Sequence, residues 1–265
     1  MSIIALASLK ASPGVTTTAL ALAGAWPTEQ RVVVAEFDPA GGDLAARFGL
    51  ASEPSLVSLA AAARRDCTDG LIWEHTRNVL SGLPIVVGPP AAQQAGTAVA
   101  MVAQGLLPAV RDLQDTVVIA DCGRLDPGSP ALGVVEHCDV LLLVARPELA
   151  EMHHLAAGLP ALRTATANLG VVLMGTGPYQ PSEIAATLGV EVVSVLPHDP
   201  QAARLLAGDG GSSRVLSRTS LMRAAHGLAA VVAARMSRPM AGPASTMAAE
   251  LAHHNGHLSV AGRAR

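Results

Sequence analysis

Short, almost unbroken runs of Val, Ile and Leu alternate with helical patterns through the first 200 residues of the chain. A strand that is covered on both faces reads as a continuous apolar run, whereas a half-exposed strand alternates apolar and polar residues. The expected strands are Ile3–Ser8, Arg31–Glu36, Pro84–Val87, Thr116–Ala120, Val140–Ala145, Val171–Met174 and Val192–Leu196. The expected helices between them are Thr17–Ala25, Leu56–Arg65, Gly96–Leu113, Leu149–Thr166 and Pro181–Leu188. This order predicts an α/β fold with a doubly wound, mostly parallel sheet of about seven strands and helices on both faces, in three layers.

Two further helices are expected after the last strand, over Pro200–Ala207 and Thr219–Met236. The longer one carries an apolar stripe, which suits either docking on the sheet or lying on a membrane surface. We favour docking, because the apolar residues are small and Arg223 and Arg235 are too few for a basic face. The stripe consists of Leu221, Ala224, Ala225, Leu228, Val231 and Val232.

From Ser237 the composition changes to Pro, Gly, Ala, Ser and His. The change predicts a folded domain over residues 1–236 and a flexible, disordered tail over residues 237–265. The tail contains His253, His254 and His257, a set that also suits a transition metal. We interpret these histidines as part of a flexible tail.

The composition excludes several classes of protein. Half of the 265 residues are hydrophobic and 15% are charged, which rules out wholesale disorder. Aromatic residues make up 2% and the net charge is −3, so neither a platform of stacked rings for nucleic acid nor a global basic field is expected. No apolar run approaches the roughly 20 residues of a membrane span. With no signal peptide and no CxxC pair among Cys67, Cys122 and Cys138, we expect a cytoplasmic protein.

The segment from Leu9 to Thr18 follows the first strand and opens a helix, which is where a phosphate-binding loop belongs. The ordinary P-loop pattern is GxxxxGK[ST]. Its last glycine and its hydroxyl are present as Gly14 and Thr16, but Leu9 and Val15 replace the first glycine and the lysine. The alternative is a Gly/Pro turn with an incidental lysine. Lys10 is the one lysine among the 18 basic residues of the chain.

The loop also resembles the deviant Walker A form, KGGxGKTT, of the ParA/MinD family of P-loop ATPases (SIMIBI class). Lys10, Gly14, Thr16 and Thr17 match that form, and the departures are Ala11, Ser12 and Val15. The resemblance implies that Lys10 reaches the phosphates bound by a partner subunit and that the family's Walker lysine is missing at Val15. The residues that it places around the nucleotide are Lys10, Ser12, Pro13, Gly14, Val15, Thr16 and Thr17.

Two further segments resemble motifs of the same family. The run Glu36-Phe37-Asp38-Pro39-Ala40-Gly41-Gly42-Asp43-Leu44 resembles its switch I segment and implies that Asp38 orients the attacking water. A capping or turn role for Asp38 is the alternative. The strand that ends in Asp121-Cys122-Gly123 resembles a Walker B strand. A buried carboxylate at a strand end needs a partner, so we expect Asp121 to hold Mg²⁺ through water together with Thr16, and Gly123 to approach the γ-phosphate.

The resemblance extends over residues 1–236. The segment from His137 to Glu148 matches a family strand and loop, and the segment from Val195 to Pro200 matches the family's adenine edge, which places Pro197 and Asp199 beside the nucleotide. The family often has Asn after the preceding strand, where this chain has Gly175-Thr176.

We therefore predict an ATP- and Mg²⁺-binding switch that forms a homodimer and acts in spatial organisation. A missing charge-assisted contact is worth about 1.5–3 kcal/mol, so we expect hydrolysis to be slow or absent. The alternative is a pseudo-ATPase scaffold that keeps the fold without the chemistry. An iron–sulfur reductase of the same superfamily is not expected, because Cys122 alone lies near a switch segment.

We expect an unidentified protein partner and no peripheral membrane contact. DNA is a weaker candidate, because the arginines near the C-terminal helices suit a solvated face better than a binding patch. These residues are Arg204, Arg214, Arg218 and Arg223.

Overall fold

The computed structural model describes residues 1–10, 13–27, 30–68, 70–109, 115–210 and 213–236. Their strands form one eight-stranded sheet in the order β3-β4-β2-β5-β1-β6-β7-β8. The bounds are β1 (Ser2–Ser8), β2 (Arg31–Glu36), β3 (Arg77–Val79), β4 (Leu83–Val86), β5 (Thr116–Arg124), β6 (Val140–Ala145), β7 (Leu169–Met174) and β8 (Val192–Leu196). All pairings are parallel except β3 with β4. The predicted fold class is confirmed, with one strand more than expected.

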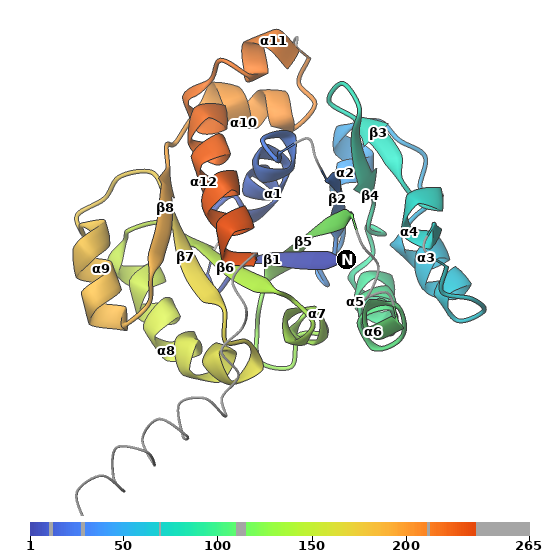
Figure 1. Cartoon of the computed structure of the whole chain (residues 1–265), viewed down its shortest axis with the longest axis horizontal. Coiled ribbons are helices and arrows are strands. Elements are labelled where there is room, and N and C mark those ends of the chain that lie inside the picture. The colour runs from blue at the N-terminus through green and yellow to red at the C-terminus, as the bar shows by residue number, and fades with distance from the viewer. Residues whose placement is uncertain (11–12, 28–29, 69, 110–114, 211–212, 237–265) are drawn as a thin grey trace, which may run out of the picture.

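Helices cover both faces of the sheet (Figure 1). The bounds are α1 (Val15–Gly24), α2 (Leu44–Arg47), α3 (Leu56–Ala63), α4 (Leu71–Glu74), α5 (Ala92–Met101), η1 (Val102–Leu106, a π-helix), α6 (Leu107–Ala109), α7 (Leu132–Glu136), α8 (Leu149–Ala165), α9 (Pro181–Leu188), α10 (Pro200–Leu206), α11 (Ser213–Leu216) and α12 (Ser220–Met236). One layer contains α1, α10 and α12, and the opposite layer contains α3, α5, α7 and α8.

The strands are apolar on both faces because each face packs against a helical layer. In β1, Ile4 and Leu6 belong to the core under α1 and α12, while Ile3, Ala5 and Ala7 belong to the core under α5 and α8. Every one of these side chains is at most 2% exposed. This arrangement explains the continuous apolar runs from which the strands were predicted.

The docked position expected for the last helix is confirmed. Leu221, Ala225, Leu228 and Val232 of α12 are buried in the core beside α1. The expected stripe was wrong at Val231, which is 39% exposed. Met222 and Ala229 are buried. Among the described helices, none combines the length and the hydropathy that crossing a membrane requires.

The tail predicted over residues 237–265, with its three histidines, lies outside the described residues. The boundary after Met236 therefore stays a prediction. The described part of the helix expected over Gly96–Leu113 lies within α5, η1 and α6. Its end at Leu113 falls outside the described residues.

The strand order reverses near the centre of the sheet. From β1 the order runs outward through β5 and β2 on one side and through β6, β7 and β8 on the other. Ligands of open α/β sheets bind beyond the carboxyl ends of the strands at such a reversal. The segment that follows β1 and opens α1 lies at that position.

Candidate nucleotide site

The turn between β1 and α1 depends on Gly14. It caps the helix in the left-handed region, at φ 105° and ψ 37°, where an L side chain is strained. Its carbonyl accepts hydrogen bonds from both the amide and the hydroxyl of Thr18, each at 2.8 Å. No side-chain cap covers the first turn of α1. The amides of that turn therefore have no intrahelical partner and suit an anion.

Val15 points into the protein core. It is 6% exposed and packs in the cluster that includes Leu20 of α1 and Leu221 of α12. Thr16 and Thr17 beside it are half-buried, and Pro13 is buried. The position at which the resemblance implies a Walker lysine is therefore filled by an apolar contact.

Lys10 is exposed and makes no ion pair or hydrogen bond with any other residue that the structure describes. It follows Leu9, whose Cδ1 would lie 2.5 Å from a Cβ on Gly158, so Leu9 packs closely on α8. Ser12, another predicted nucleotide contact, lies outside the described residues, as does Ala11.

Asp121 lies near the end of β5 and is 1% exposed. Burial raises its pKa to about 6, although hydrogen bonds from the Thr16 hydroxyl and the Gly123 amide partly oppose this. The Gly123 amide donates to Asp121 Oδ1 at 3.2 Å. The structure thus brings together Thr16 and Asp121, the pair expected to hold a magnesium ion.

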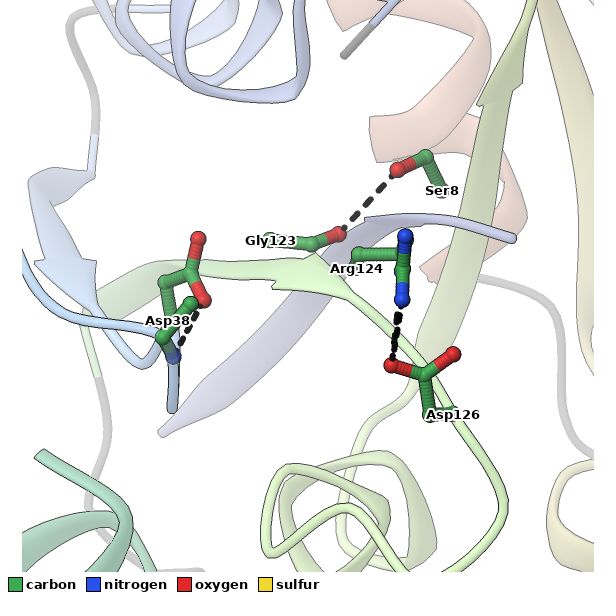
Figure 2. Close-up of polar contacts among 6 residues, drawn as sticks. Ser8, Asp38, Gly123, Arg124 and Asp126 are labelled. Atoms are coloured by element: carbon green, nitrogen blue, oxygen red, sulfur yellow. Dashed lines mark hydrogen bonds and ion pairs between the residues drawn. The ribbon is translucent and has the colours of Figure 1, made fainter. Parts of the chain in front are cut away.

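Asp38 lies directly against Gly123 (Figure 2). A Cβ on Gly123 would fall 2.1 Å from the Asp38 carboxyl carbon, and Gly123 has φ +57°. Both facts require glycine at this position. The Ala40 amide donates to Asp38 Oδ1 at 2.8 Å, and burial raises the pKa of Asp38. The two carboxylates are also close enough for Asp38 to raise the pKa of Asp121.

Glu36 has a role that the sequence did not indicate. It is 3% exposed, and burial raises its pKa to about 7. Its Oε1 accepts the amides of Asp43 at 2.8 Å and Leu44 at 2.9 Å, and its Oε2 accepts the amide of Gly88 at 2.9 Å. Glu36 therefore ties the segment that carries Asp38 to the chain beyond β4. The available signal was its place at a strand end, where a buried carboxylate needs donors.

The predicted residues after β8 lie at the same edge of the sheet. Asp199 caps α10 by accepting the Ala202 amide at 2.9 Å, and it accepts the Ser220 hydroxyl at 2.7 Å. These bonds lower the pKa of Asp199. Its carboxylate is thus engaged in joining α10 to α12, and Pro197 beside it is half-buried.

The end of β7 connects this region to the phosphate loop. A Cβ on Gly14 would lie 3.6 Å from Met174 Cε, and a Cβ on Gly175 would lie 3.6 Å from the Cβ of His198. The residues predicted around the phosphates and those predicted around the base therefore face one continuous edge.

Within the described residues, no group of three His, Cys, Asp or Glu side chains suits a metal ion. A magnesium ion at this edge fits Thr16 and Asp121 only if phosphate and water supply the other oxygens, which is how Mg²⁺ is held in many nucleotide sites. Cys122 and Cys138 are free and buried, and burial raises the pKa of both thiols, that of Cys138 to about 12. Neither suits thiolate chemistry.

No protein-family model matches the chain, and no curated protein matches its sequence. Solved structures do match it. A ParA family ATPase from Chlorobium tepidum has 18% identity and a TM-score of 0.70, covering 86% of this chain and 98% of that one. The septum site-determining protein MinD of Pyrococcus horikoshii, solved with Mg-ADP, has 19% identity and a TM-score of 0.69 over 90% and 99%. An ATP complex of Cyanothece McdA has 17% identity and a TM-score of 0.64 over 88% and 96%. The fold is the one that these ATPases share.

Proposed function

We propose that this chain is a nucleotide-operated switch, which binds ATP with Mg²⁺ and forms a homodimer around it. The observation that carries the proposal is the meeting of Thr16, Asp121 and Asp38 beside the uncapped first turn of α1. Thr16 and Asp121 would hold the magnesium ion, and Asp38 would orient water. The ion, when bound, would draw charge from the phosphate oxygens and position them.

The other predicted contacts have defined roles in this proposal. The backbone from Ser12 to Thr17 would bind phosphate oxygens, and Gly123 would approach the γ-phosphate. Pro197 and Asp199 would lie beside the base. Lys10 would act on the phosphates of the partner subunit, a role that suits its exposed side chain.

Hydrolysis is expected to be slow or absent, because Val15 supplies no charge where the transition state develops it. We propose a cytoplasmic role in spatial organisation, such as the partitioning of chromosomes or plasmids or the positioning of division, secretion or pilus machinery. The names of the similar structures, a ParA family ATPase and a septum site-determining protein, support this class of role.

The second candidate is a pseudo-ATPase scaffold, a localisation protein that keeps the fold and the dimer face. The burial of Val15 in the core favours it, because the loop has packed an apolar side chain in place of a phosphate contact. In either case a protein partner is expected. DNA is a weaker candidate, through exposed arginines on and between the helices α10, α11 and α12. These residues are Arg204, Arg214, Arg218 and Arg223.

Calorimetric titration of the full chain with ATP and Mg²⁺ separates the two candidates. The switch predicts a micromolar dissociation constant that Lys10→Ala abolishes and Lys10→Arg largely keeps. Absence of binding at millimolar ATP would support the scaffold and reject the switch. Sedimentation with and without ATP reports the dimer in the same samples.

A further inference from the structure

Arg124 lies at the same edge as the predicted site residues, although no motif pointed to it. It is the last residue of β5 and pairs in register with Ser8, the last residue of β1. The Leu125 amide donates to the Ser8 carbonyl at 2.9 Å, which fixes this pairing beyond the bulge at Gly123. Because paired strands lie about 4.8 Å apart, the Arg124 side chain starts next to the strand end that leads into Lys10.

The Arg124 guanidinium is held by an ion pair that is easily exchanged. Its Nη2 and Nε donate to Asp126 Oδ2 at 3.0 and 3.3 Å, and the two side chains are 52% and 58% exposed. Both donors use one oxygen, so the pair lacks the two parallel bonds of a strong Arg–carboxylate contact. Exposed pairs of this kind contribute little to stability. A phosphate group offers the two oxygens that the fork of a guanidinium matches.

The charge balance of the site calls for such a cation. Asp38 and Asp121 place two carboxyl groups beside the expected phosphates, and Val15 is apolar. Figure 2 shows Asp38 on one side of Gly123 and the Arg124–Asp126 pair on the other. The chain thus carries a guanidinium on the residue next to the glycine that contacts Asp38.

We propose, on the basis of the nucleotide site proposed above, that Arg124 binds phosphate oxygens of the nucleotide. Asp126 holds the Arg124 guanidinium until the nucleotide binds. Binding of ATP with Mg²⁺ exchanges the Asp126 carboxylate for phosphate on the same guanidinium. Arg124 then supplies part of the positive charge that the apolar Val15 cannot supply. Asp126 sets how readily the Arg124 guanidinium is released to the phosphate.

A double-mutant cycle on ATP affinity tests this exchange. Dissociation constants for ATP with Mg²⁺ are measured by calorimetry for the full-length wild type, Arg124→Gln, Asp126→Asn and the double variant. Arg124→Gln is expected to weaken binding at least fivefold, near the tenfold value of one charge-assisted contact. Asp126→Asn is expected to tighten binding at least twofold. The double variant is expected to match Arg124→Gln, because Asp126 acts only through Arg124.

Arg47→Gln is the matched control. Arg47 is also in an ion pair, with Asp43 at 3.1 Å, and it is close enough to Asp121 to lower the pKa of that carboxyl. A loss below fivefold for Arg124→Gln, an equal loss for Arg47→Gln, or an Asp126→Asn gain that persists in the double variant would each overturn the inference alone. A wild type that binds no ATP would overturn the proposed function together with it.

Discussion

The two halves of the candidate site are built in different ways. On the side of β2 and β5, Glu36 and Asp121 are buried carboxyls with two or three donors each, and Asp38 lies against the Gly123 backbone. On the side of the expected phosphate loop, Val15 packs in the core, and the exposed Lys10 is the single lysine of the chain. The acidic half is fixed by the fold, whereas the positive charge comes from side chains at the surface.

This difference separates the residues expected to hold the metal ion from those expected to act on the transferred phosphoryl group. A buried carboxylate beside a threonine hydroxyl suits a hydrated metal ion, whether or not the protein hydrolyses ATP. Turnover needs positive charge near the transferred phosphoryl group, and Val15 supplies none from the loop. The acidic half should therefore make binding depend on Mg²⁺, and the loop half should contribute to both ATP affinity and the rate of hydrolysis.

The largest effect is expected at Asp121. Asp121→Ala removes the expected anchor of the magnesium ion, so ATP affinity in the presence of Mg²⁺ should fall at least about a hundredfold, or roughly 2.7 kcal/mol. Asp139→Ala is the control, because Asp139 accepts the Ile3 amide at 2.8 Å at the opposite end of β1. Thermal melting checks that both variants fold. Unchanged affinity in a folded Asp121→Ala protein would remove Asp121 from the site.

The next effect concerns pH. The Glu36 pKa rises from its ordinary 4.5 to about 7 in the folded protein, so between these values the folded state binds more protons than the unfolded state. The free energy of unfolding should therefore fall as pH rises through this window, by up to about 3 kcal/mol. Urea unfolding at pH 5 and pH 8 measures the fall, which Glu36→Gln should reduce. Equal falls in both proteins would contradict the buried acid.

A smaller effect is expected when a cation is introduced at position 15. Val15→Lys should tighten ATP binding about tenfold, near the low end of the roughly 1.5–3 kcal/mol of a charge-assisted contact, because the lysine must leave the buried position that Val15 fills. Val15→Met, which keeps an apolar side chain of similar length, should leave ATP affinity unchanged. Calorimetry measures both. If Val15→Lys folds and still binds no ATP, the scaffold is the better description.

The sequence pointed to Asp38 and Asp121 in the acidic half, but it did not predict the hydrogen bonds made within that half. Asp38 and Asp121 were found because their segments resemble the switch I and Walker B motifs of the ParA/MinD family, and because ligands of open α/β sheets bind beyond the carboxyl ends of the strands. The bonds of Glu36 were not found, because one donor, Gly88, is 52 residues away in the chain. Val15 was identified as a departure from a pattern, but its burial depends on a core cluster whose residues come from elements far apart in the chain, which no local pattern reports.

The same limit applies to the fold. Seven strands were predicted because their apolar runs are continuous. β3 was missed because it has three residues, two of them Arg77 and Asn78, and it adds to the sheet only as an antiparallel edge. β5 runs four residues past its predicted end, because its polar residues continue the strand as far as Arg124, which pairs with Ser8 of β1.

The smallest effect is expected at the exposed acid of the same segment. Asp43 is paired with Arg47 at 3.1 Å, and its side chain is 72% exposed. Asp43→Asn should change the free energy of unfolding by about 0.3–0.5 kcal/mol, the usual value of an i,i+4 pair. Urea unfolding at pH 7 measures it. A loss of several kcal/mol would mean that this segment depends on its surface charges as much as on Glu36.

The most direct measurement is a crystal structure of the full chain with Mg²⁺ and a non-hydrolysable ATP analogue. The account predicts phosphate oxygens on the backbone amides from Gly14 to Thr17 and a metal ion between the Thr16 hydroxyl and the Asp121 carboxylate. An empty loop at saturating analogue, or a nucleotide bound away from Asp121, would contradict the account.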